Sequence, residues 1–228
     1  PKPRPARASF RILEARLIRR AGAVVTVPAS IAEELKARYG VPLPLDLWHL
    51  AIGSDETHFE PLSYLLARRP DLDVDALHAQ RRAVRDQLLS RLTPCAGVSE
   101  RLAEARAHGL RLAVASSSER AWVEHHLDRL GLRAHFSALR CREDVARVKP
   151  DPTLYRAALE ALEVLPEQAV AFEDSPNGVK AAVAAGMRCV AIPGPMTRGL
   201  SFEAAHLCLA SLAEHTLGVD LRIDQLLG

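Results

Sequence analysis

Four polar side chains in the second half of the sequence have the types and spacing that suit the handling of a phosphate group. They are Ser116, Lys149, Glu173 and Asp174, and each stands at the end of an apolar run or in a loop beside one. A serine hydroxyl can donate to a phosphate oxygen, and a lysine can neutralise phosphate charge. Adjacent acids repel each other unless a cation is present, and oxygen ligands without Cys or His favour Mg²⁺. The alternative for the acids alone is a polar turn without function.

The two acids follow an apolar run, Ala169–Phe172, that is typical of a strand buried on both faces. The next residues, 175–178, form a predicted turn with Pro176 near the first position of a short helix that ends at Gly186. Both carboxylates are therefore expected at the carboxyl end of a parallel strand. In open α/β sheets, ligands bind at that end.

The other polar groups have equivalent positions. A predicted strand, Leu110–Ala115, ends in three serines (116–118) and is followed by a helix over 119–130. Lys149 begins a proline-rich loop that leads into a helix over 153–163. Further strands are predicted at Phe136–Arg140 and Arg188–Pro193. This alternation of strand and helix predicts a parallel sheet with right-handed crossovers, an α/β Rossmann-like core.

The first part of the chain is different. Residues 1–22 are rich in arginine and proline and are expected to form a basic N-terminal tail, with a targeting peptide as the alternative. Ala23–Val27 is predicted as a strand. Residues 31–93 contain helix signals but no clear strand, and predict an all-helical cap inserted into the core. The core would then consist of residues 23–30 and 94–228.

Composition excludes several classes of protein. The chain has 228 residues, of which 48% are hydrophobic and 25% charged, and its net charge is +2. That charge argues neither for nor against nucleic acid, and no nucleic-acid partner is expected. No apolar run approaches the roughly 18 residues of a membrane span. The four cysteines are widely separated, which favours a reduced, cytoplasmic protein without structural zinc.

Three motifs give the site a more specific interpretation. Residues 114–118, 148–152 and 172–178 read Val-Ala-Ser-Ser-Ser, Val-Lys-Pro-Asp-Pro and Phe-Glu-Asp-Ser-Pro-Asn-Gly. Their order and spacing resemble the second, third and fourth motifs of the haloacid dehalogenase superfamily, in its phosphatase and β-phosphoglucomutase-like branch with a helical cap. Residues 31–93 resemble that cap, and Ala51–Ser54 resembles its substrate-facing loop.

The resemblance implies a role for each candidate residue. Lys149 and Ser116 would be catalytic, and together with Ser117 they would bind the phosphate. Glu173 and Asp174 would bind Mg²⁺, and Gly53 and Ser54 would face the substrate from the cap. The partner would be a small phosphorylated metabolite, and the protein would be a monomer or weak dimer.

One part of the family pattern is not found in this sequence. The first family motif, Asp-x-Asp-Gly, supplies the aspartate that becomes phosphorylated, but the first aspartate here is Asp46, within the predicted cap. Neither Thr26 nor Val27 can form an acyl phosphate. Acids to consider in its place are Glu14, Glu33 and Glu34.

Two main hypotheses follow. The first is a Mg²⁺-dependent phosphatase, inactive or impaired unless another acid fills the gap, with a phosphomutase as a variant. Asp55 and Glu56 next to the cap loop favour the phosphatase. The second is a non-catalytic relative that binds a phosphorylated ligand. A Rossmann dehydrogenase is disfavoured because no G-x-G-x-x-G follows a strand.

Overall fold

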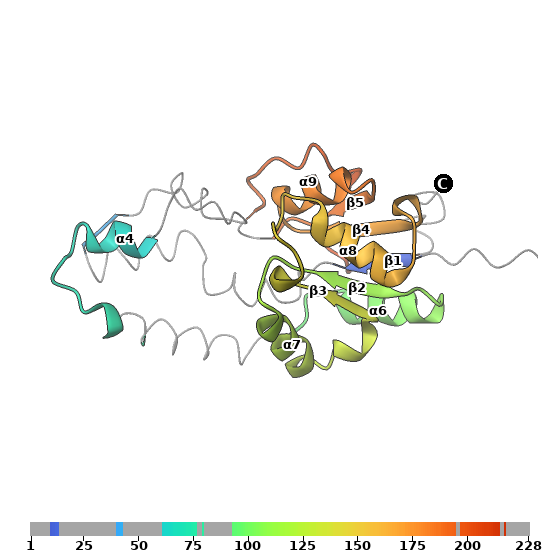
Figure 1. The fold of residues 1–228 in the computed structure, drawn as a ribbon, viewed down its shortest axis with the longest axis horizontal. Helices are drawn as coiled ribbons and strands as arrows, with labels where there is room; N and C mark the ends of the chain where they lie inside the picture. Colours follow the sequence, from blue (N-terminus) through green and yellow to red (C-terminus); the bar gives the residue numbers. More distant parts are fainter. Residues whose placement is uncertain are drawn as a thin grey trace, which may run out of the picture.

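The computed structural model describes residues 10–13, 40–42, 61–76, 79, 93–194, 197–214 and 217. Within them, six strands form one parallel sheet in the order β3-β2-β1-β4-β5-β6 (Figure 1). The strands are β1 (Phe10–Leu13), β2 (Leu112–Ala115), β3 (Ala138–Arg140), β4 (Ala169–Glu173), β5 (Arg188–Ala191) and β6 (Leu207–Cys208). This parallel α/β sheet confirms the predicted fold class.

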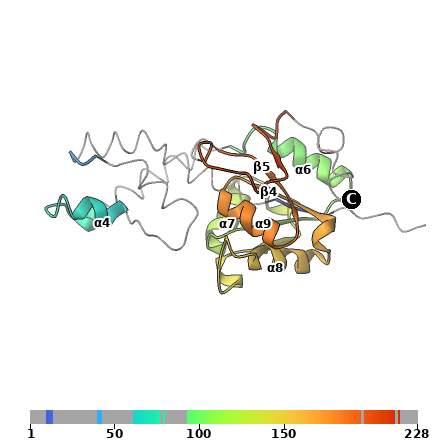
Figure 2. The ribbon, with the colours of Figure 1, turned by 90° about the horizontal axis from the view of Figure 1, so that it is seen from above.

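Helices cover both faces of the sheet, as Figures 1 and 2 show. The α-helices are α4 (Pro61–Leu66), α6 (Val98–Ala107), α7 (Arg120–Arg129), α8 (Thr153–Leu162) and α9 (Pro176–Ala184), and short 3₁₀ turns are η1 (Arg133–His135), η2 (Arg142–Asp144) and η3 (Pro166–Gln168). α6 and α7 pack in one hydrophobic cluster, and α8 and α9 pack in the other. The helices predicted at the positions of α7, α8 and α9 are therefore confirmed.

Successive strand residues point into opposite clusters, as expected for strands buried on both faces. In β4, Val170 and Phe172 belong to the cluster with α6 and α7, whereas Ala169 and Ala171 belong to the cluster with α8 and α9. The strand residues of the second cluster are small: Ala113, Ala115, Ala138, Ala169, Ala171, Cys189 and Ala191. Small side chains allow a helix to approach the sheet closely. The larger Tyr155 of α8 is accommodated on this face.

The central strand β1 differs from the sequence prediction. Residues 10–13 were expected in the basic tail, but their backbone pairs with β2 and with β4, with Ile12 opposite Ala113 and Leu13 opposite Phe172. The tail prediction is wrong for these four residues. A strand with a neighbour on each side has its backbone groups hydrogen-bonded on both sides. This pairing forms here although the surrounding sequence is rich in arginine. The strand predicted at Ala23–Val27 lies outside the described residues.

The predicted cap, 31–93, is described only in part. Its described residues (40–42, 61–76, 79 and 93) include α4 and contain no strand, and α4 lies away from the sheet in both ribbon views. The cap boundaries stay a prediction, and Gly53 and Ser54 lie outside the described residues. Across the part of the chain that the structure describes, no helix combines the length and apolarity required to span a bilayer.

Asp151 connects the Lys149 loop to α8. Its carboxylate accepts hydrogen bonds from the Thr153 amide, at 3.0 Å, and from the Thr153 hydroxyl, and it pairs with Arg147 at 2.7 Å. These contacts, the Thr153 hydroxyl foremost, hold the pKa of Asp151 below its ordinary value. A lowered folded pKa contributes stability above the unfolded pKa, and this contribution is lost as the pH falls through the folded pKa.

Asp151→Ala is therefore expected to lower the free energy of unfolding by about 1 kcal/mol at neutral pH, because the hydrogen bonds from Thr153 are lost. The difference from wild type should shrink as the pH falls below about 4, the ordinary pKa of an aspartate, and through the lower pKa that Asp151 has in the folded protein. Urea denaturation between pH 7 and pH 2 measures both. A difference that stays constant over this range would show that the carboxylate charge has no part in the effect.

Candidate active site

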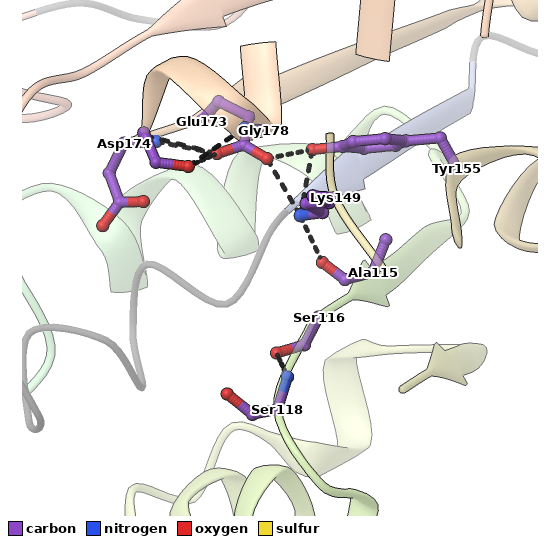
Figure 3. Close-up of polar contacts among 9 residues, drawn as sticks. Ala115, Ser116, Ser118, Lys149, Tyr155, Glu173, Asp174 and Gly178 are labelled. Carbon is purple, nitrogen blue, oxygen red and sulfur yellow. Dashed lines mark hydrogen bonds and ion pairs between the residues drawn. The ribbon is translucent and has the colours of Figure 1, made fainter. Parts of the chain in front are cut away.

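The centre of the candidate site is the ammonium group of Lys149, whose side chain is only 1% exposed. Its Nζ donates to the Ala115 carbonyl oxygen at 2.8 Å and to Glu173 Oε1 at 2.9 Å, and lies 3.4 Å from the Tyr155 hydroxyl. In the proline-rich loop that Lys149 begins, the Lys149–Pro150 peptide bond is cis. Figure 3 shows Lys149 between the ends of β2 and β4. A buried cation is thus held beside the serine loop.

Glu173, at the end of β4, is fully buried and uses both carboxylate oxygens within the protein. Oε1 accepts from Lys149 and from the Tyr155 hydroxyl, at 2.6 Å. Oε2 accepts from the amides of Asp174 and Ser175, at 3.1 and 3.4 Å, and from the Ser175 hydroxyl at 3.3 Å. A buried carboxylate requires such partners because its desolvation is otherwise costly.

The contacts of Lys149 with Ala115 and Glu173 reach across the end of the central strand, β1. β1 lies between β2 and β4, and Lys149 links the end of one neighbour to the end of the other. Strands are about 4.8 Å apart, so the two linked ends are separated by roughly 10 Å. The chain leaves β1 at Leu13, and the next residue in the sequence is Glu14.

The serine loop after β2 has two features that suit an anion. Ser116 is fully buried, and its Oγ accepts a hydrogen bond from the Ser118 amide at 3.1 Å, which leaves the hydroxyl proton available to donate. The Ser117 Oγ is buried and has no hydrogen-bond partner among the described residues. An unsatisfied buried hydroxyl is costly, and a ligand oxygen would satisfy it.

One amide at the start of α7, the helix that follows the serine loop, is not available to a phosphate. The first amide of α7, that of Arg120, donates to both carboxylate oxygens of Glu143, at 2.9 and 3.0 Å. This amide is therefore already used by a carboxylate of the protein. Contacts to a phosphate would come mainly from the serine hydroxyls and Lys149.

Asp174 lies next to Glu173 but has different surroundings. Its side chain is turned away from Lys149 (Figure 3). Its carbonyl oxygen accepts a hydrogen bond from the Thr197 hydroxyl at 2.6 Å, and the Thr197 Oγ1 also accepts from the Gly194 amide at 3.0 Å. These bonds fix the backbone of Asp174 to the loop after β5. Of the two acids predicted to bind Mg²⁺, Asp174 is the better candidate, because the oxygens of Glu173 already accept several bonds.

The described residues do not by themselves form a magnesium site. Among them, no group of three or more His, Cys, Asp or Glu side chains could hold a metal ion. Mg²⁺ prefers six oxygen ligands, usually including one or two carboxylates together with water and phosphate oxygens. Asp174 alone would be an incomplete set.

Gly178, in the first turn of α9, is required by the position of Glu173. A Cβ added at Gly178 would lie 1.8 Å from Glu173 Oε1, which is far inside contact distance. Replacing a helical glycine with alanine normally stabilises a helix by about 1 kcal/mol. Gly178→Ala is expected instead to destabilise the protein by roughly 1–3 kcal/mol, because the carboxylate must move.

Thermal unfolding measures this effect, with Gly199→Ala as the control, since a Cβ there meets nothing within 4 Å. A Gly178→Ala protein that is as stable as Gly199→Ala would show that the Glu173 carboxylate does not occupy this position.

Two residues that the sequence analysis did not single out contribute to the site, Tyr155 and Thr197. Tyr155 lies among the apolar core positions of α8, where it reads as part of the hydrophobic face. The one general rule that could have singled out Tyr155 is that a buried tyrosine hydroxyl usually requires a hydrogen-bond partner. Thr197 lies in a loop with no recognisable pattern.

Comparisons with known proteins agree with this geometry. The sequence model of the haloacid dehalogenase-like hydrolase family matches residues 33–192. The Bacillus subtilis (strain 168) protein YhcW is 36% identical over 190 residues, which cover 83% of this chain and 86% of YhcW. A phosphorylated carbohydrates phosphatase of Thermotoga maritima is 34% identical over 152 residues, which cover 65% of this chain and 69% of that protein.

A solved structure is also similar. The crystal structure of CbbY from Rhodobacter sphaeroides in complex with phosphate has a TM-score of 0.58 and 28% sequence identity, and the match covers 92% of this chain and 98% of CbbY. The segment matched by the family model contains Ser116, Lys149, Glu173 and Asp174. On this evidence, the chain belongs to the family of haloacid dehalogenase-like hydrolases.

Proposed function

We propose that the chain binds a small phosphorylated carbohydrate through its phosphate group, at the carboxyl ends of β2 and β4, in a site of the phosphatase type. The observation that carries this proposal is the buried Lys149 ammonium held between the Ala115 carbonyl and Glu173. A buried cation with a fixed position is suited to a dianionic ligand, because its charge is poorly screened by solvent. The relatives that act on phosphorylated carbohydrates or bind phosphate support the same ligand class.

Each residue has a separate part in this proposal. The hydroxyls of Ser116 and Ser117 donate to phosphate oxygens, and Lys149 neutralises part of the phosphate charge. Glu173 orients Lys149. Asp174 would supply one oxygen ligand to Mg²⁺, which would neutralise further phosphate charge when bound, and such an ion would require further ligands besides Asp174. The substrate-facing part of the predicted cap, with Gly53 and Ser54, would select the carbohydrate.

Catalysis requires one more group. In phosphate-ester hydrolysis of this type, a carboxylate attacks phosphorus and forms an acyl phosphate as the alcohol leaves, and water then hydrolyses the acyl phosphate. The sequence has no Asp-x-Asp-Gly, and Glu14 is the acid that follows the central strand. We propose that turnover by this chain is impaired. A non-catalytic phosphate-binding protein is the second candidate function, and a phosphomutase the third.

Calorimetric titration of the full chain distinguishes these proposals. The ligands are a hexose 6-phosphate, a hexitol 6-phosphate and inorganic phosphate, with the unphosphorylated hexose and hexitol as controls, each with and without Mg²⁺. Binding is expected for the three phosphates and not for the two controls. Equal binding of the phosphorylated and unphosphorylated sugars would overturn the proposal. Colorimetric detection of released phosphate separates the phosphatase from the binding protein.

A further inference from the structure

Tyr155 makes contacts that a core residue of α8 would not require. It is fully buried, and its hydroxyl donates to Glu173 Oε1 at 2.6 Å while lying 3.4 Å from Lys149 Nζ. The Lys149 ammonium also lies 4.7 Å from the centre of the tyrosine ring. Both the ring and the hydroxyl of one side chain therefore face the buried ion pair (Figure 3).

Two contacts converge on one carboxylate oxygen. Glu173 Oε1 accepts from Tyr155 at 2.6 Å and from Lys149 at 2.9 Å. The other oxygen, Oε2, is held by the backbone of residues 174 and 175. The carboxylate is thus fixed at both ends. Because Lys149 is anchored to Oε1, the position of its ammonium depends on that of the carboxylate.

The Lys149 ammonium has three protons to donate. The Ala115 carbonyl and Glu173 receive short hydrogen bonds, at 2.8 and 2.9 Å, whereas the 3.4 Å contact with Tyr155 is long. A phosphate oxygen can replace this weakest contact without disturbing the other two. The Tyr155 hydroxyl would keep its own bond to Glu173 during the exchange.

We propose that Tyr155 is a positioning residue for the phosphate site: its hydroxyl fixes the Glu173 carboxylate, and through it the Lys149 ammonium that contacts the phosphate. This inference rests on the proposed phosphate-binding function. It predicts that the hydroxyl of Tyr155 affects phosphate affinity without touching the phosphate, and only while the Glu173 carboxylate is present to accept its hydrogen bond.

The test is a titration of the full chain with inorganic phosphate, followed by calorimetry. Tyr155→Phe is expected to weaken phosphate binding about 10-fold, as the loss of a hydrogen bond to a charged group does. The control is Leu162→Val, a change at a fully buried position of the same helix. It should lower the thermal unfolding temperature and change phosphate affinity less than about 2-fold.

A double-mutant cycle provides the readout that a merely structural role would not move. Glu173→Gln is expected to weaken phosphate binding, and Tyr155→Phe should have little further effect in that background, because Tyr155 acts through Glu173. Leu162→Val should have the same small effect in both backgrounds. If Glu173→Gln does not fold, as judged by circular dichroism, the comparison of Tyr155→Phe with Leu162→Val decides.

The outcomes are distinct. If wild type binds phosphate and Tyr155→Phe binds it with the same affinity, the positioning role is overturned and the proposed function stays intact. Additive effects of Tyr155→Phe and Glu173→Gln also overturn it. No phosphate binding by wild type overturns the proposed function and, with it, this inference.

Discussion

Lys149→Met is expected to remove most of the phosphate affinity of this chain. The substitution keeps a long apolar side chain but loses the charge-assisted contact, which is worth roughly 1.5–3 kcal/mol, or about 10- to 100-fold in affinity. It also leaves the fully buried Glu173 carboxylate without its cationic partner. Breaking a buried ion pair in this way costs about 3–5 kcal/mol of stability. Phosphate titration and urea denaturation measure the two effects separately.

Two further variants separate affinity from stability. Lys149→Met combined with Glu173→Gln removes both charges, and should recover part of the lost stability while phosphate binding stays weak. Lys180→Met is the matched control, since Lys180 is an exposed lysine on α9 and should change stability by no more than about 0.5 kcal/mol. Recovery of phosphate affinity in the double variant would contradict a direct role for the Lys149 charge.

Hydrolysis of an aryl phosphate by the unmodified chain, with Mg²⁺ present, is expected to stay near background. In the proposed site the described groups bind and neutralise a phosphate, but an acyl phosphate requires a carboxylate nucleophile, and the sequence contains no Asp-x-Asp-Gly. Because the central strand is Phe10–Leu13, the place to restore this motif is directly after Leu13. A triple variant with Glu14→Asp, Arg16→Asp and Leu17→Gly has the sequence Asp-Ala-Asp-Gly at residues 14–17.

The triple variant is expected to raise turnover by at least about 10³-fold, since removing the nucleophile of a serine protease costs on the order of 10⁶-fold in kcat. It should also accumulate an acid-stable, hydroxylamine-sensitive phosphoprotein. The matched control carries Glu14→Asn with the same Arg16→Asp and Leu17→Gly changes, so that it differs from the triple variant only in lacking the nucleophilic carboxylate. Vigorous hydrolysis by the unmodified chain that Asp174→Ala abolishes would contradict this account. A Glu14→Gln variant would then show whether Glu14 is the nucleophile.

The fold could be predicted where apolar runs alternate with helix signals. β2, β4 and β5 are short, apolar and buried on both faces, and they were predicted within a few residues of their observed bounds. β1 could not be predicted, because four residues among arginines give no local signal, and their pairing with β2 and β4 is a long-range interaction. The two-residue strand β6 is too short to have a periodicity.

The candidate site was predicted to the extent that its residues follow strands. The structure brings together the ends of β2 and β4, with Lys149 between them, as the shared edge of a parallel sheet requires. The difference between the surroundings of the two acids could not be predicted. Glu173 and Asp174 are adjacent in sequence, but only the position of Tyr155 and the start of α9 shows that Glu173 is the one enclosed by donors.

The most direct test of the phosphate site is a crystal structure of the full chain with tungstate, a tetrahedral analogue of phosphate that anomalous scattering locates without ambiguity. The expected result is one strong tungsten peak beside the end of β2, with oxygens within hydrogen-bond distance of Lys149 Nζ and the Ser116 hydroxyl. The peak should be absent from crystals of Lys149→Met grown and soaked in the same way. A peak elsewhere on the protein, or none near Lys149 at saturating tungstate, would contradict the account.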